Sequence, residues 1–142
     1  MVGASACLLG FRCRYNGESK VDPELLEMFE NGRVLPICPE VFGGLGIPRK
    51  PSYIDGGTGR EFWEGRAKVI TIDGEDVSKH FKKGARISLT LLKLSGIKKV
   101  FLKEKSPSCG VTLTYSSKNR LIPGPGVATS LFEKEGITVT PR

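Results

Sequence analysis

The N-terminal region predicts a strand, a helix and a second strand in succession, and this order leaves few possible folds. The apolar run 2–8, rich in small residues, is typical of a strand buried on both faces. Asp22 is a favourable N-cap, Pro23 suits the first helical position, and Gly32 is a natural helix end. Residues 33–37 predict the second strand, so the two strands should be parallel and joined by a right-handed crossover.

The rest of the chain continues this alternation of strands and helices. Residues 42–66 are dense in Gly and Pro, and we expect a long loop insertion there, of the kind that often forms a functional lid. We expect a single α/β domain over residues 1–142, with three layers and a mostly parallel, Rossmann-like sheet. Its further elements are a strand or hairpin arm at 67–72, a helix at 76–95, a strand at 98–102, a helix at 126–134 and a strand at 137–140.

Composition narrows the class of protein. The chain has 22 basic and 15 acidic residues, a net charge of +7, but no run of five or six like charges. It offers no obvious aromatic platform for stacking bases, so we do not expect nucleic-acid binding. No apolar stretch is long enough for a membrane span and the N-terminus lacks a signal-peptide pattern, so we expect a cytoplasmic protein. The oligomeric state cannot be read from the sequence.

Four cysteines, at positions 7, 13, 38 and 109, are the strongest chemical signal in the chain. A cytoplasmic protein of this size has little use for a disulfide framework, so metal binding or catalysis is favoured. Cys7 ends the first predicted strand, Cys38 follows the second, and Cys109 lies in the loop after the strand at 98–102. Because ligands bind at the carboxyl ends of parallel strands, we expect these three thiols to meet in one crevice.

Three thiolates without a fourth protein ligand favour an iron–sulfur cluster over zinc. The only histidine, His80, falls on the predicted helix at 76–95, away from the cysteine loops. A four-iron cluster with three cysteine ligands would leave one iron open to a sulfur-containing substrate. Cys13 leaves two alternatives, because it could be a fourth ligand that closes the cluster or, beside the cation of Arg14, a reactive thiol.

Three polar residues are further candidates for the site. Glu40 lies two residues after Cys38 and could relay a proton, although a solvated loop carboxylate is an equal alternative. Ser106 and Ser108 could donate hydrogen bonds to a substrate or to cluster sulfurs. The alternative for both serines is ordinary turn chemistry around Pro107.

These cysteines stand in motifs that resemble a bacterial and archaeal family which includes the thiouracil desulfidases. Residues 5–10, Ser-Ala-Cys-Leu-Leu-Gly, and residues 13–17, Cys-Arg-Tyr-Asn-Gly, resemble its opening motif. Residues 36–41, Pro-Ile-Cys-Pro-Glu-Val, resemble its second motif. Residues 102–110, ending in Ser-Pro-Ser-Cys-Gly, resemble its third motif, and residues 124–131 resemble its fourth. The motifs occur in order over nearly the whole chain.

The resemblance implies a 4Fe-4S cluster bound by Cys7, Cys38 and Cys109. It also implies a substrate that is a small thiolated base or nucleoside. With 2-thiouracil, hydrolytic desulfidation would give uracil and sulfide, and the open iron would bind the sulfur of the substrate.

The same resemblance suggests roles for the remaining candidates. Glu40 would carry the proton, and Ser106 or Ser108 would orient the base. Cys13 is better interpreted as a catalytic or pocket residue than as a ligand, and we expect Arg14 and Ser108 to contact the substrate.

Two rival interpretations remain. One is a metal-free enzyme in which Cys13 or Cys109 acts as a nucleophilic or redox thiol. The other is a non-enzymatic protein, either an electron carrier with a closed cluster or an accessory protein that handles thiolated tRNA.

Overall fold

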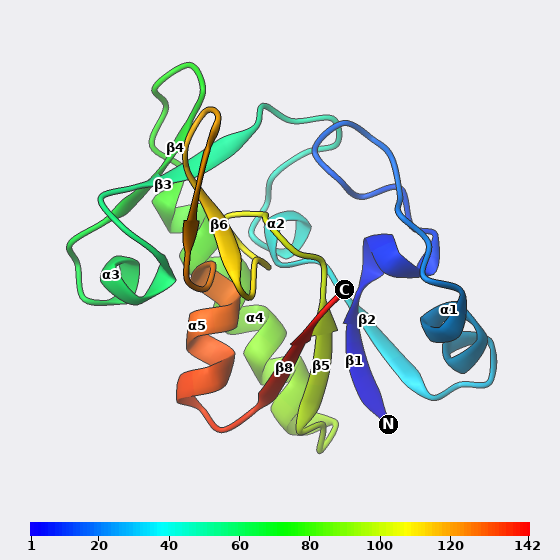
Figure 1. Cartoon of the computed structure of the whole chain (residues 1–142). Helices are drawn as coiled ribbons and strands as arrows, with labels where there is room; N and C mark the ends of the chain where they lie inside the picture. The colour runs from blue at the N-terminus through cyan, green and yellow to red at the C-terminus, as the bar shows by residue number, and fades with distance from the viewer.

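The central element of the computed structural model, which describes all 142 residues, is a four-stranded parallel sheet (Figure 1). The strand order is β2–β1–β5–β8, with β1 and β5 in the centre. The strands are β1 (Val2–Ser5), β2 (Val34–Ile37), β5 (Lys99–Leu102) and β8 (Thr138–Pro141). The predicted parallel sheet is therefore confirmed, and β1 and β2 form the expected parallel pair.

Helices cover both faces of the sheet and produce the predicted three layers (Figure 1). Helix α1 (Pro23–Glu30) packs on one face, and helices α4 (Ser78–Leu94) and α5 (Val127–Lys134) pack on the other. Strand β5 shows the alternation that this requires, because Phe101 joins a core of nine buried residues on the α1 side. Its neighbours Val100 and Leu102 join a core of 18 buried residues on the α4 side.

The helix signals in the sequence act as predicted. The Asp22 carboxylate caps α1 by accepting a hydrogen bond from the Leu25 N–H at 3.2 Å. Gly32 and Gly96 follow α1 and α4 with φ values of 70° and 66°, the left-handed conformation that suits glycine after a helix. None of the helices could span a membrane, because none is both long and apolar enough. The helix predicted at 76–95 buries one stripe of α4, formed by Phe81, Ala85, Ser88, Leu89 and Leu92.

The predicted long loop at 42–66 is wrong, because this segment folds. It contains strand β3 (Ser52–Asp55), which pairs antiparallel with β4 (Lys68–Thr71), and helix α3 (Gly59–Trp63). Thr58 and Glu61 form a capping box at the start of α3, a local signal that was present in the sequence. The high Gly and Pro content of this segment favoured a loop, and a helix of five residues is too short to show the helical period.

Three other short elements shape the region around the cysteines. Strand β1 ends at Ser5, earlier than predicted, and residues Ala6–Leu9 form a 3₁₀ turn, η1. Helix α2 (Pro39–Phe42) starts directly after Cys38. Strands β6 (Leu113–Ser117) and β7 (Arg120–Pro123) form an antiparallel hairpin that we did not predict.

Glycine allows α2 to lie directly against α4. A Cβ atom on Gly84 of α4 would overlap the carbonyl oxygen of Pro39, and one on Gly43 would overlap the carbonyl oxygen of His80. Gly3 in β1 has a similar role, since a Cβ there would lie 2.7 Å from Leu92 Cδ2. These close approaches set the position of α2 relative to the sheet.

Candidate functional site

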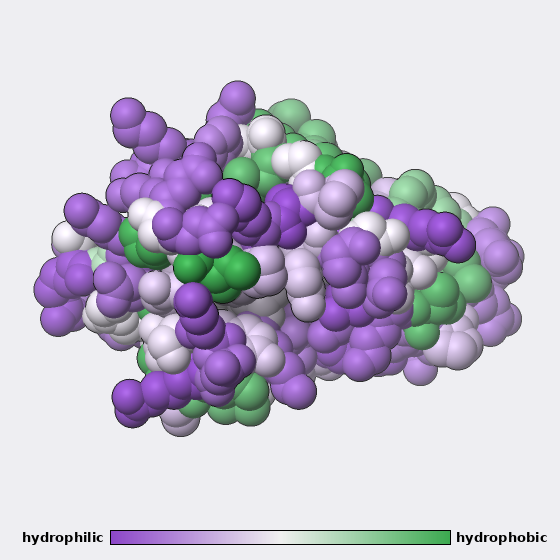
Figure 2. Space-filling view, turned by 90° about the horizontal axis from the view of Figure 1, so that it is seen from above, coloured by the Kyte–Doolittle hydropathy of each residue, from purple (hydrophilic) through white to green (hydrophobic).

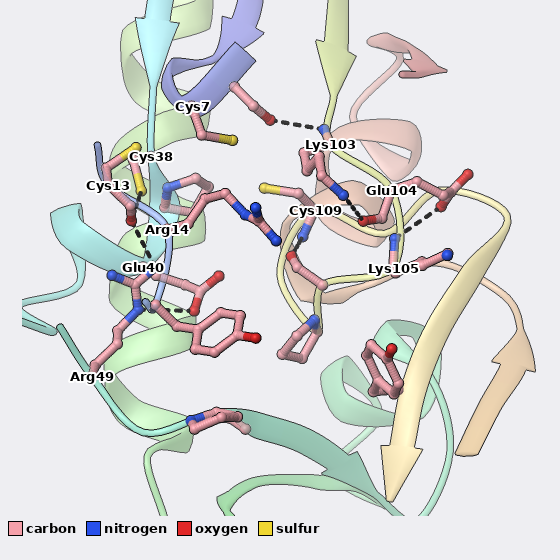
Figure 3. A pocket seen from close by; sticks show the side chains of 18 of the residues that line it. Cys7, Cys13, Arg14, Cys38, Glu40, Arg49, Lys103, Glu104, Lys105 and Cys109 are labelled. Atoms are coloured by element: carbon pink, nitrogen blue, oxygen red, sulfur yellow. Dashed lines mark hydrogen bonds and ion pairs between the residues drawn. The ribbon is translucent and has the colours of Figure 1, made fainter. Parts of the chain in front are cut away.

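A cavity of about 690 Å³ lies at the carboxyl ends of β1, β2 and β5. All four cysteines line it, although they are far apart in the sequence. They come from different elements, because Cys7 lies in η1, Cys38 precedes α2, and Cys13 and Cys109 lie in loops (Figure 3). Hydrophilic residues dominate this face of the molecule, with apolar patches between them (Figure 2). The topology therefore brings the three predicted ligands into one crevice.

The arrangement of the thiols indicates what they could bind. No group of three or more His, Cys, Asp or Glu side chains is gathered closely enough to hold one metal ion. The four thiols instead line a shared cavity, three of them buried and Cys38 partly buried. Ligands spaced around a volume fit a polynuclear group better than a single ion, and thiolates are the ligands that iron–sulfur clusters prefer. The residues therefore fit a cluster.

The thiols of Cys13, Cys38 and Cys109 are protonated in the absence of a metal. Burial, reinforced by the nearby Glu40 and Cys38, raises the pKa of Cys109 to about 12. A hydrogen bond with Cys38 favours the Cys13 thiolate, but a hydrogen bond with Cys7 and burial outweigh it, and the pKa of Cys13 rises to about 11. The hydrogen bond with Cys13 and burial raise the pKa of Cys38 well above its usual range. Because the thiolate is the nucleophile, this weighs against a metal-free thiol enzyme.

Glu40 reaches the cavity from the first turn of α2, and it is held there by Arg49. The Arg49 Nε donates to Glu40 Oε1 at 3.2 Å, and its Nη2 donates to the carbonyl oxygen of Cys13 at 3.0 Å (Figure 3). The Arg49 side chain is 9% exposed and that of Glu40 is 15% exposed, so the pair is largely withdrawn from water. Sequence reasoning assigned no role to Arg49, because no local pattern links it to Glu40.

The two serines before Cys109 occupy different positions. Ser106 lines the cavity, and its Oγ accepts from the N–H of Cys109 at 2.7 Å, which leaves its own hydroxyl proton free to donate. Ser108 is 1% exposed and is not among the cavity residues. The hydroxyls of Ser5 and Ser108 hydrogen-bond to the Cys109 thiol and favour its thiolate. Of the two serines, only Ser106 therefore lines the cavity, and the substrate contact expected for Ser108 stays a prediction.

Positive charge dominates the lining of the cavity. Its carboxylates are Glu40, paired with Arg49, and Glu104, hydrogen-bonded to backbone N–H groups. Burial together with the neighbouring Lys20 and Arg14 lowers the pKa of Lys103. An anionic group or a set of thiolates would be stabilised here by the cations. The cationic residues without a buried carboxylate partner are Arg14, Lys20, Lys103, Lys105 and Lys118.

These features define a class, an α/β protein with a cysteine-rich, cationic cavity at the carboxyl edge of a parallel sheet. The profile of one family, 2-thiouracil desulfurase, matches residues 2–142. The chain belongs to this family, so the resemblance inferred from the motifs is confirmed.

Two relatives extend over nearly the whole chain. The uncharacterized protein YbbK of Bacillus subtilis (strain 168) is 37% identical over 141 residues, which cover 98% of this chain and 93% of YbbK. The solved structure of the 4Fe-4S-dependent thiouracil desulfidase TudS is 39% identical and superposes with a TM-score of 0.87. That match covers 99% of this chain and 89% of the TudS chain, and it confirms the predicted fold class.

Proposed function

We propose that this protein is a 4Fe-4S-dependent desulfidase that removes sulfur from a small thiolated base or nucleoside, with 2-thiouracil as the first substrate to test. The observation that carries the proposal is the meeting of Cys7, Cys38 and Cys109 in one cavity beside Glu40. The family match and the likeness to TudS support it. Residues 1–142 would act as one iron–sulfur-binding domain.

Cys7, Cys38 and Cys109 would hold the cluster, because they lie at the ends of three neighbouring strands of the sheet. A cluster with three cysteine ligands supplies an open iron, a Lewis acid with high affinity for the sulfur of the substrate. Cys13 contacts Cys7 and Cys38 by hydrogen bonds, so it would serve as a catalytic or pocket residue beside two ligands. The cations of the lining would offset the charge of the thiolates.

The reaction would exchange C=S for C=O, with water as the source of oxygen and hydrogen sulfide as the second product. No electrons are gained or lost in this exchange. The Glu40 carboxylate would accept a proton from the attacking water and return it to the leaving sulfur. Arg49 would keep one oxygen of Glu40 oriented, since its Nε donates to Oε1 at 3.2 Å.

Substrate orientation would depend on two other groups of the cavity. The Ser106 hydroxyl can donate to a ring nitrogen or oxygen, because its acceptor position is already used by the Cys109 N–H. Arg14 lies in the lining and can donate to an oxygen of the base.

The decisive experiment is anaerobic reconstitution with iron and sulfide, followed by iron quantitation and a 2-thiouracil turnover assay, for the wild type and four single Cys→Ala variants. We expect about four irons per chain. The iron content should fall in the variants at positions 7, 38 and 109 and remain in the variant at position 13. Release of uracil and sulfide should follow cluster content.

The other outcomes distinguish the rival functions. No iron under any reconstitution condition would leave a thiol-based enzyme as the explanation. Equal dependence of the iron content on all four cysteines would indicate a closed cluster and an electron carrier instead. A loaded cluster without turnover of any thiolated base or nucleoside would argue for an accessory role.

A further inference from the structure

We propose that Glu104 is the positioning residue that holds the Cys109 loop closed, and that it thereby sets how long a cluster is retained. This inference rests on the proposed function in one respect, since it takes Cys109 as a cluster ligand. It concerns a residue to which neither the motifs nor the family match assigns a role.

The carboxylate of Glu104 accepts hydrogen bonds from residues 111–113, which follow Cys109 where the loop from β5 enters β6. Its Oε1 accepts from the backbone N–H groups of Val111 at 2.6 Å, Thr112 at 3.0 Å and Leu113 at 3.3 Å. Its Oε2 accepts from the Thr112 hydroxyl at 2.7 Å. Glu104 comes two residues after β5 and Leu113 begins β6, so the carboxylate joins the two ends of the loop that carries Cys109.

These contacts leave the Glu104 carboxylate with little capacity to accept further hydrogen bonds from a ligand. Although it lines the cavity (Figure 3), both of its carboxylate oxygens accept hydrogen bonds from protein donors. Burial alone would raise the pKa of Glu104. The hydrogen bonds from the Thr112 hydroxyl and from backbone N–H groups outweigh burial, so the pKa of Glu104 lies below its usual range. It is therefore ionised at neutral pH, and hydrogen bonds to an ionised carboxylate are stronger than those between neutral groups.

The opposite side of the loop is held by α5. The N–H groups of Val127 and Ala128 donate to the carbonyl oxygens of Pro107 and Ser108 at 2.8 and 2.9 Å. The Thr129 hydroxyl donates to the carbonyl oxygen of Cys109 itself at 3.1 Å. The backbone of the ligand loop is thus fixed to α5 on one side, and Glu104 supplies the restraint on the other.

The backbone next to Glu104 supports this role. Lys105 has φ of 78°, which makes it the only residue other than glycine in the left-handed region. This conformation is unfavourable for lysine, and such residues persist only where the surroundings hold them. Two contacts hold it here, because the Lys105 N–H donates to Glu104 Oε1 at 3.4 Å and the Lys105 carbonyl oxygen accepts from the Tyr115 N–H of β6 at 3.3 Å.

The test uses Glu104→Ala and Glu104→Gln in the full chain, loaded anaerobically and then challenged with an iron chelator well below the melting temperature of every variant. The visible absorbance of the cluster reports its lifetime. We expect Glu104→Ala to lose the cluster about tenfold faster or more, as is typical when a partner of a ligand is removed. Glu104→Gln should recover most of the lifetime, because its amide oxygen can still accept from the three backbone N–H groups.

Val34→Ala is the matched control, since it removes buried apolar volume at the start of β2, at the amino end of the sheet. It should lower the melting temperature without changing the cluster lifetime. Thr112→Val removes the hydrogen bond that the Thr112 hydroxyl donates to Glu104, and it should shorten the cluster lifetime by a smaller factor. This variant provides the test if Glu104→Ala fails to fold.

A second measurement separates this inference from the proposed function. In the cluster-free chain, alkylation followed by mass spectrometry should show faster modification of Cys109 in Glu104→Ala, with Cys7 and Cys38 unchanged. The alkylation measurement tests the role of Glu104 even if the protein takes up no iron. Unchanged cluster lifetime and unchanged Cys109 alkylation in Glu104→Ala would overturn the inference, as would an equal loss of lifetime in Val34→Ala.

Discussion

The Nε of Arg49 donates to Oε1 of Glu40 across 3.2 Å, between two side chains that are both largely shielded from water. The same guanidinium donates to the carbonyl oxygens of Cys13 at 3.0 Å and Gly46 at 3.2 Å. Arg49 therefore ties α2, the Cys13 loop and the segment after α2 together. Because removal of one partner leaves the other charge buried and unpaired, the orientation of Glu40 depends on Arg49.

We expect Arg49→Ala to lower kcat for sulfide release by about 100-fold, because a small displacement of a proton-transfer group has an effect of this size. Arg49→Lys should lie between this variant and the wild type, since lysine keeps the charge but not the fork of donors. The control is Arg66→Ala, which breaks an exposed ion pair with Glu64 and should leave kcat unchanged. Wild-type kcat in Arg49→Ala would contradict a positioning role.

Glu40→Gln should lower kcat by about 10²- to 10⁴-fold, the usual contribution of a general acid or base. Its iron content should match that of the wild type, because Glu40 is not one of the proposed ligands. Iron quantitation and turnover should be measured on the same samples, with the exposed Glu30→Gln as the control. If Glu40→Gln lost iron together with activity, a structural role would replace the catalytic one.

Gly84→Ala should destabilise the protein by about 1–3 kcal/mol, since the added methyl group overlaps the carbonyl oxygen of Pro39 and forces α2 away from α4. The displacement would also move Cys38 and Glu40, so cluster content should fall with stability. Urea unfolding measures the first effect and iron quantitation the second. Lys83→Ala, at an exposed position on the same helix, should change the unfolding free energy by less than about 0.5 kcal/mol.

Glu104 should make the free energy of unfolding depend on pH. Its pKa is lowered in the folded protein, so the unfolded chain binds the proton first as the pH falls. The stabilisation by Glu104 is therefore fully present above the usual glutamate pKa of about 4.3 and is lost as the pH falls through the lower folded-state value. Unfolding free energies of the wild type and Glu104→Gln, measured over a pH series, should converge in acid. A constant difference over the series would show that the charge of Glu104 is not responsible.

Exposure to air or to an iron chelator should abolish desulfidation, and anaerobic reconstitution should restore it. The reason is that the thiols of Cys13, Cys38 and Cys109 are protonated without a metal, with the pKa of Cys109 at about 12, and so provide no thiolate nucleophile. Sulfide release should be followed before removal, after removal and after reconstitution of the same sample. Full activity in iron-free protein would disprove the cluster-dependent reaction.

Much of the framework follows from local sequence signals. The N-cap at Asp22 and the helix end at Gly32 depend only on neighbouring residues, and both were predicted correctly. The strand–helix–strand order also places Cys7 and Cys38 at one edge of the sheet, because parallel strands share their carboxyl ends. These inferences succeed because periodicity, caps and crossover handedness are properties of short segments and of their order.

Only the tertiary structure decided which side chains meet at that edge. The pairing of Arg49 with Glu40, the burial of Ser108 and the closure of the Cys109 loop by Glu104 all depend on loop conformations. Strand β3 and the β6–β7 hairpin were likewise not predicted from the sequence, whereas β4 matches the strand or hairpin arm predicted at 67–72. The sequence by itself determined the framework and the location of the thiols. The contacts that orient them arise from packing between segments distant in the chain, which no local pattern encodes.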